Sequence, residues 1–197
     1  MAAFELCLEH GCDGFEFDVR GAAGVPVVCH DEAFRGLRLA DASSGDLAAQ
    51  QALGFLPPLE QVLRQFAPRC FLDIEIKESG LESQVLALLR RYPPQRYVVT
   101  SFSPEVLRRL RELSPEIELG LIWDEPGGPW QSISAQWALP ERRLLNRELA
   151  AELLGAGKRI GAWTANDAAD MVRLAGLGAE MLISDETARL VNTFRVS

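Results

Sequence analysis

Acidic side chains and one lysine occupy alternating positions in two strand-like segments, and this spacing indicates a cation-binding site. In the stretch GFEFDV, Glu16 and Asp18 share one face, because the side chains of a β-strand alternate between its two faces. In the stretch FLDIEIK, Asp73, Glu75 and Lys77 share a face in the same way. Carboxylates clustered on otherwise apolar strands repel one another and lose hydration. A bound divalent cation would offset this cost directly.

A third stretch, VVCHDE, adds a group that can transfer protons. Histidine is the residue type best suited to general acid or base chemistry near neutral pH, and His30 is followed directly by Asp31. A solvated loop histidine is the alternative interpretation. Phe102 and Trp163 each stand at the end of a strand-like segment, where they would line a pocket or pack in the core.

The charged residues also have plainer interpretations. Glu16 and Asp18 could face solvent on an edge strand. Asp73 is better explained as a hydrogen-bonding partner than as a metal ligand. Lys77 could simply pair with a carboxylate at the end of its strand. His10, late in the first helical segment, is expected to be a helix C-terminal histidine that the helix dipole stabilises.

Strand-like and helix-like segments alternate along the chain, which indicates parallel βα units. The link between Val19 and Val25 is an exception, because it is too short for a crossover helix and contains two glycines. It predicts that residues 25–30 return as an antiparallel hairpin arm. The other seven strands fall one short of a closed eight-stranded βα barrel. The expected strands are residues 13–19, 25–30, 70–76, 96–101, 117–122, 133–137, 158–163 and 180–184.

Helix signals fall between most of these strands. Ser103 followed by Pro104 is typical of a capped helix start with proline at the first helical position. Residues 36–56 are weakly patterned and are expected to form a loop with a short helix. A loop is expected at residues 126–129, which read Pro-Gly-Gly-Pro. No domain boundary is visible, so residues 1–197 are expected to form a single domain.

The composition excludes several classes of protein. The 197 residues are 48% hydrophobic, which provides for a sizeable core. A net charge of −8 argues against nucleic acid or an anionic membrane surface as the main partner. No apolar run reaches the roughly 18 residues that cross a bilayer. The four cysteines lack CxxC spacing and are expected to be buried, reduced thiols, and two histidines make a Cys/His zinc cluster unexpected.

Most of the chain, from Ala2 to about Val191, resembles the glycerophosphodiester phosphodiesterase family. The combination of E-x-D, HD and EIK in this order and spacing is specific, whereas each motif alone would be weak. The resemblance implies a (β/α)₈ barrel of the TIM type. It also implies hydrolysis of a small-molecule glycerophosphodiester to an alcohol and glycerol 3-phosphate, in lipid and glycerol metabolism. The stretches that carry the resemblance are AAFELCLEHGCDGFEFDV, GVPVVCHDE, LPPLEQVL, LDIEIK, VVTSFSPEVLRRLRELSPEIELGLI, GAWTAND and LGAEMLISD.

The same resemblance implies roles for five residues. The family holds a divalent cation, Mg²⁺ or Ca²⁺, which Glu16, Asp18 and Glu75 would bind here. All three are oxygen donors, as a hard cation requires. His30 would be one of two catalytic histidines, and Lys77 would hold the phosphate charge.

The sequence departs from the family pattern mainly at its start. The family begins with a strand bearing H-R-G and a loop with P-E-N, and no counterpart precedes Ala2. The first barrel strand and the first catalytic histidine are therefore expected to be missing. Residues 34–38 also replace an Arg-Thr-Thr type of stretch, and the last strand ends in Ser184-Asp185 where the family often has Thr-Asp.

Three functional hypotheses follow. The first is a hydrolase whose active site a segment absent from this chain completes. The second is a catalytically impaired or non-catalytic relative that binds metal or phosphate, or a truncated fragment. The third is another metal-dependent barrel that cleaves phosphoinositides or sphingomyelin, which substrate profiling would distinguish.

Two further expectations concern the environment of the protein. Without a first barrel strand, residues 13–19 and 180–184 would each expose an unpaired strand edge, which predicts self-association or marginal stability. The chain has no positively charged and apolar leader typical of a signal peptide, so we expect a cytoplasmic location, although the missing lead-in is where such a leader would lie.

Overall fold

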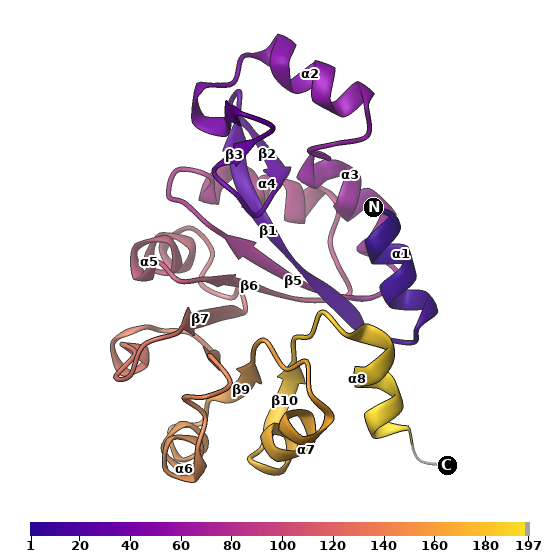
Figure 1. Cartoon of the computed structure of the whole chain (residues 1–197). Coiled ribbons are helices and arrows are strands. Elements are labelled where there is room, and N and C mark those ends of the chain that lie inside the picture. Colours follow the sequence, from indigo (N-terminus) through magenta and orange to yellow (C-terminus); the bar gives the residue numbers. More distant parts are fainter. Residues whose placement is uncertain (196–197) are drawn as a thin grey trace.

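Strands and helices alternate through most of the computed structural model, which describes residues 1–195 (Figure 1). The strands are β1 (Gly14–Ala22), β2 (Val25–Val28), β3 (Ala33–Phe34), β4 (Leu37–Arg38), β5 (Phe71–Ile76), β6 (Arg96–Ser101), β7 (Leu119–Trp123), β8 (Trp137–Pro140), β9 (Arg159–Ala162) and β10 (Ala179–Leu182). The helices are α1 (Ala2–Glu9), α2 (Ser44–Ala52), α3 (Leu59–Phe66), α4 (Glu82–Arg91), α5 (Pro104–Leu113), α6 (Arg147–Gly155), α7 (Ala168–Gly176) and α8 (Thr187–Phe194). Two short 3₁₀ helices, η1 and η2, span Leu39–Asp41 and Trp130–Ser132.

The main sheet has the strand order β10-β9-β8-β7-β6-β5-β1-β2. Every neighbouring pair is parallel except β1 and β2, which form an antiparallel hairpin in which Val19 pairs with Val28. The prediction of seven parallel strands plus a hairpin arm is therefore confirmed. The sheet curls, and most of the helices lie outside the curl (Figure 1).

The curled sheet is open between β1 and β10. Within residues 1–195, β10 pairs only with β9, and the Gly14–Asp18 part of β1 has a ladder partner only in β5. Helices α1 and α8 lie side by side next to this opening (Figure 1). His10, the C-terminal cap of α1 as predicted, places Nδ1 2.7 Å from Oγ1 of Thr187 at the start of α8. The described part of the chain is thus a half-barrel with two strand edges.

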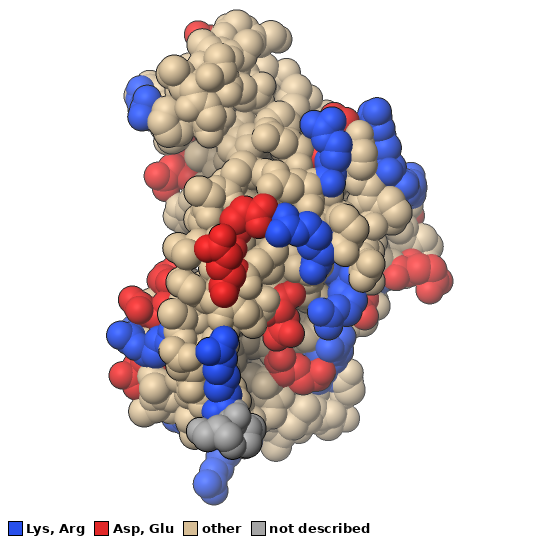
Figure 2. All heavy atoms as spheres, turned by 90° about the vertical axis from the view of Figure 1, so that its right-hand side faces the viewer, with Lys and Arg blue, Asp and Glu red and all other residues tan. Residues whose placement is uncertain are grey.

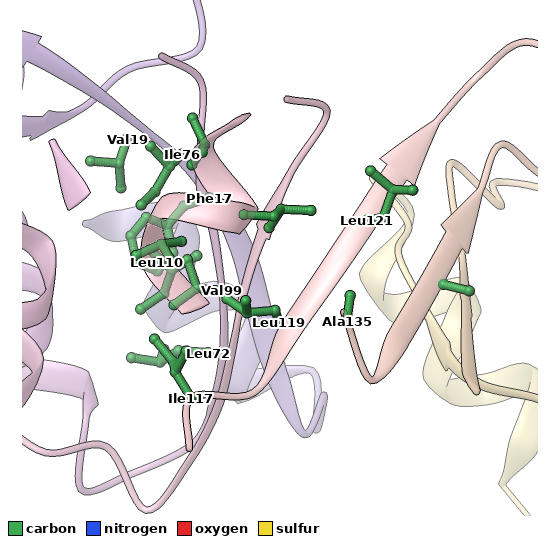
Figure 3. Packing of buried hydrophobic residues seen from close by; sticks show 14 of the residues in the cluster. Phe17, Val19, Leu72, Ile76, Val99, Leu110, Ile117, Leu119, Leu121 and Ala135 are labelled. Atoms are coloured by element: carbon green, nitrogen blue, oxygen red, sulfur yellow. The ribbon is translucent and has the colours of Figure 1, made fainter. Parts of the chain in front are cut away.

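The outward face of the sheet holds the main core. Phe17 and Val19 of β1 and Leu72 and Ile76 of β5 are buried, and Leu110 of α5 packs among them (Figure 3). The apolar positions that alternate with the carboxylates therefore face the helices. This is the arrangement that the period-two pattern predicts.

The inward face is divided into an apolar and an acidic part. Val98, Ile122, Trp137 and Leu139 form a separate buried cluster inside the curl. Across from it, the β1–β5 register places Glu16 opposite Asp73 and Asp18 opposite Glu75. The period of two in each strand and this register together bring four carboxylates to one side of the interior.

Two local predictions are wrong and one is confirmed. The strand expected at 133–137 lies at Trp137–Pro140, because Ile133 and Ala135 bury their side chains from a loop instead of a strand. The four thiols are free, but only Cys7 and Cys70 are buried, whereas the other two are half-buried. The short helix expected within 36–56 is α2, which Ser43 caps with its side chain.

Positive and negative side chains are mixed on the face shown in Figure 2, where Lys and Arg lie among Asp and Glu. None of the helices in residues 1–195 has the length and apolar character to cross a membrane.

Gly14 allows β1 to approach β5 closely. A Cβ added to Gly14 would lie 1.9 Å from the carbonyl oxygen of Phe71. We expect Gly14→Ala to destabilise the protein by roughly 3 kcal/mol or more, because backbone must move to relieve the overlap. Urea unfolding would measure the loss. Gly155→Ala is the control, since nothing lies near its Cβ position, and a loss equal to that of the control would contradict the prediction.

Candidate active site

The carboxylates of Glu16, Asp18 and Glu75 converge inside the half-barrel. Each offers one oxygen, and these three oxygens lie within 4.8 Å of one another. Strands β1 and β5 run in parallel, so the two residues of β1 and the one of β5 reach the same point of the interior. The structure thus brings together the three residues that the sequence resemblance singles out.

Lys77 lies among these carboxylates. Its Nζ is 2.8 Å from Oδ1 of Asp18 and 2.6 Å from Oε1 of Glu75, and its side chain is 15% exposed. Burial lowers the pKa of Lys77, but the hydrogen bonds to Asp18 and Glu75 outweigh it and raise the pKa above its usual value. The lysine is therefore held as a cation at this point. The ion pairs of Lys77 with Asp18 and Glu75 agree with the plainer interpretation of Lys77 as an ion-pair partner at the end of its strand.

Burial makes the acidic cluster costly to ionise. It raises the pKa of Glu16 to about 9, with Asp18, Asp73 and Glu75 adding like-charge repulsion. It raises the pKa of Asp73 to about 7 and that of Glu75 above its usual value. The interpretation of Glu16 and Asp18 as solvent-facing residues is wrong, although this part of β1 does lie at the open edge of the sheet. The side chain of Asp18 is 16% exposed, and Oε1 of Glu16 is buried.

Asp73 has a structural contact. The hydroxyl of Thr100, on β6, donates a 2.6 Å hydrogen bond to Oδ1 of Asp73, and Asp73 is 1% exposed. This agrees with the prediction that Asp73 is a hydrogen-bonding partner. Thr100 itself carries no signal in the sequence that would have identified it.

The cluster fits a hard divalent cation. All three converging donors are carboxylate oxygens, which Mg²⁺ and Ca²⁺ prefer. Oε1 of Glu16 is buried without a hydrogen-bond partner among the described residues. Four carboxyl groups, those of Glu16, Asp18, Asp73 and Glu75, face the one positive charge of Lys77, and a bound cation would favour the ionised forms that burial disfavours.

His30 lies in the loop that follows β2. Its side chain is 75% exposed, and its Nδ1 is 2.9 Å from Oδ1 of Asp31. The backbone oxygen of His30 accepts a 2.8 Å hydrogen bond from Nε of Arg20. Arg20 in turn pairs with Glu78 at 3.3 Å, which ties the hairpin to the end of β5. Arg20 and Glu78 thus connect the His30 loop to the end of β5, a link that the sequence pattern did not reveal.

Phe102 and Trp163 lie together near Lys77. Their rings are edge to face with centroids 5.4 Å apart. Nζ of Lys77 is 5.6 Å from the centroid of Phe102, so the aromatic pair borders the acidic cluster. Nε1 of Trp163 donates to the backbone oxygen of Leu139, and the ring joins the apolar cluster inside the curl. Trp163 therefore both packs in the core and borders the site.

A curled parallel sheet with polar groups inside, toward the carboxyl ends of the strands, defines a TIM-barrel type of enzyme. The model of the glycerophosphoryl diester phosphodiesterase family matches residues 1–189. The chain belongs to this family, and its enzyme class is that of the phosphoric diester hydrolases. A glycerophosphodiester phosphodiesterase of Caldanaerobacter subterraneus subsp. tengcongensis is 26% identical over 99% of this chain and 91% of its own length.

Solved structures share the fold. A glycerophosphodiester phosphodiesterase from Thermotoga maritima superimposes with a TM-score of 0.83 at 23% identity, covering 97% of this chain and 89% of its own. An Oleispira antarctica phosphodiesterase in complex with the product sn-glycerol-3-phosphate gives a TM-score of 0.83 at 22% identity, covering 98% and 89%. These neighbours confirm the barrel fold class that the sequence predicts.

The raised pKa of Glu16 predicts a pH dependence of stability in chelator. The folded-state pKa of about 9 exceeds the unfolded value of 4.5, so the contribution of Glu16 to the free energy of unfolding is fully present below pH 4.5 and is lost as the pH rises toward 9. Glu16→Gln removes this ionisation and should make the metal-free protein more stable at pH 7, by roughly 1–3 kcal/mol. Urea unfolding at pH 5 and pH 8 would measure both effects.

Glu116→Gln provides the control for this experiment, because Glu116 is exposed in the turn before β7. An equal change in both variants would contradict the assignment of the pH dependence to Glu16.

Proposed function

We propose that this protein hydrolyses glycerophosphodiesters to an alcohol and glycerol 3-phosphate, with Mg²⁺ or Ca²⁺ bound by Glu16, Asp18 and Glu75. The observation that carries the proposal is the convergence of three carboxylate oxygens within 4.8 Å beside a buried lysine. Family membership supports the reaction. The Oleispira antarctica neighbour, which is in complex with sn-glycerol-3-phosphate, supports that product.

Each residue has a chemical role in this proposal. A bound cation would offset the carboxylate charge and polarise a phosphoryl oxygen. Lys77, already charged between Asp18 and Glu75, supplies a second positive charge for the phosphate. His30 transfers a proton at Nε2, since Asp31 engages Nδ1. In hydrolysis this proton goes to the oxygen of the leaving alcohol.

Phe102 and Trp163 complete the proposed site as walls of the substrate pocket. Their position beside Lys77 supports this role, because the phosphate and its alcohol must lie next to each other. The competing hypothesis of a non-catalytic relative that binds metal or phosphate predicts binding without turnover. The cytoplasmic location stays a prediction from the sequence.

Release of glycerol 3-phosphate from glycerophosphocholine tests the proposal. We expect release with Mg²⁺ or Ca²⁺, none with a chelator, and none from Glu75→Ala, because that variant loses one of three cation ligands. His30→Ala should lower kcat by roughly 10²–10⁴-fold, and Asp31→Asn by less, because Asp31 only orients the ring. Glu116→Ala is the control. Folded wild-type protein that binds the cation and releases no product would favour the non-catalytic hypothesis.

The open strand edges lead us to propose self-association as well. Unpaired edges of β1 and β10 in residues 1–195 offer backbone groups to another copy of the chain. We expect the apparent mass to rise with protein concentration in sedimentation or light scattering. A monodisperse, stable monomer over the whole concentration range would argue against this expectation.

A further inference from the structure

We propose that Arg20 is a positioning residue, which fixes the loop of His30 against the end of β5 and thereby sets the rate of hydrolysis. This inference rests on the proposed function, in which His30 transfers a proton. It assigns to Arg20 an effect on kcat that acts only through His30, in contrast to a direct contact with the phosphate.

Arg20 continues the row of charged side chains along β1. Side chains two residues apart share a face of a strand, so Arg20 follows Glu16 and Asp18 on the inward face. Its side chain is 14% exposed, and NH1 of its guanidinium is 3.3 Å from Oε2 of Glu78. The guanidinium is therefore held at the end of the sheet where Lys77, the residue before Glu78, also lies.

The backbone ladder of the β1–β2 hairpin ends just before His30. The amide of Cys29 donates to the carbonyl oxygen of Asp18 at 3.0 Å, and neither residue 30 nor residue 31 makes a backbone–backbone bond within residues 1–195. At this point Nε of Arg20 donates its 2.8 Å hydrogen bond to the carbonyl oxygen of His30. The side chain of Arg20 thus extends the ladder by one residue and holds the peptide of the histidine itself.

Glu78 fixes the other end of this link. Its Oε2 pairs with Arg20, and its Oε1 accepts a 2.8 Å hydrogen bond from the amide of Gly21. A Cβ added to Gly21 would lie 3.1 Å from that Oε1, so glycine lets the carboxylate approach closely. Both carboxylate oxygens are engaged, which gives the arginine a fixed partner directly after Lys77.

The backbone anchor matters because the ring of His30 is open to solvent. Its side chain is 75% exposed, and Asp31, which lies 2.9 Å from Nδ1, is 78% exposed. Packing around these two side chains is therefore too sparse to set the distance from Nε2 to the oxygen of the leaving alcohol. A misplacement of about 1 Å can cost about 10²-fold in rate, so the contact of Arg20 with the His30 peptide governs the alignment.

A double-mutant cycle on the hydrolysis of glycerophosphocholine tests the proposal. We expect Arg20→Gln to lower kcat by about tenfold, as expected for the loss of a hydrogen bond from a charged group, and to change KM by less than about twofold. In the His30→Ala background the same substitution should change kcat by less than about twofold, because no imidazole is left to align. Arg109→Gln, which removes an exposed arginine of α5 that pairs with Glu112 at 3.0 Å, should leave kcat unchanged in both backgrounds.

A second measurement reads the histidine directly and needs no turnover. The chain has two histidines, and His10, which contacts Thr187, serves as an internal reference. In NMR spectra of Arg20→Gln we expect the imidazole signals of His30 to shift and amide exchange at residues 30–31 to become about tenfold faster, while the signals of His10 stay unchanged. Arg20→Lys keeps the charge but lacks the fork that reaches both partners, and should show the same changes to a smaller extent.

The outcomes separate this inference from the proposed function. An equal loss of kcat in both backgrounds would overturn the inference, because Arg20 would then act on the phosphate or on overall stability. Unchanged kcat or unchanged His30 signals in Arg20→Gln would overturn it as well, while upholding the proposed function if the wild type hydrolyses the diester. Wild-type protein that hydrolyses no diester would refute the proposed function, and the NMR and exchange data would then decide alone whether Arg20 fixes the loop.

Discussion

Burial of like charges between β1 and β5 is the constraint on which the rest of the site depends. Four carboxylates face the same interior, and burial raises the pKa of Glu16 to about 9. Lys77 offsets part of this cost through contacts to Asp18 and Glu75. A slip of one residue in either strand would exchange its acidic and apolar faces. The register of β1 against β5 therefore determines which side chains enter the apolar core and which carboxylates meet at the candidate site.

Apolar packing on the outward face of the sheet offsets the free-energy cost of burying carboxylates on its inward face. Phe17 and Leu72 pack with the helices, and burial of each large apolar side chain contributes about 1.5–3 kcal/mol. The β1–β2 hairpin extends the sheet beside this pair and carries the loop of His30. Because Arg20 binds both the backbone of His30 and Glu78, the end of β5 and the histidine loop are held in a fixed relation.

The interior of the half-barrel has an acidic side and an aromatic, apolar side. A phosphodiester likewise has a charged phosphate and the organic groups attached to it. The acidic cluster with Lys77 suits a phosphate bound through a cation, whereas the aromatic and apolar side suits the groups attached to it. Phe102 stands at the boundary, 5.6 Å from Nζ of Lys77 and on the wall of a cavity. Substrate selection and phosphate chemistry can therefore reside in different residues of one half-barrel.

The sequence alone determined the alternation of strands and helices, the hairpin, and the faces on which Glu16 and Glu75 lie, because period-two patterns and short glycine links are local. It misplaced β8, since buried apolar residues in a loop resemble a strand. Only the tertiary structure decided that Lys77 lies between two carboxylates and that Arg20 contacts the histidine loop. The opening between β1 and β10 in residues 1–195, in contrast, was expected from the missing first strand. Those contacts depend on which segments distant in sequence lie together and on where the ends of long side chains are placed. Local periodicity in the sequence specifies neither.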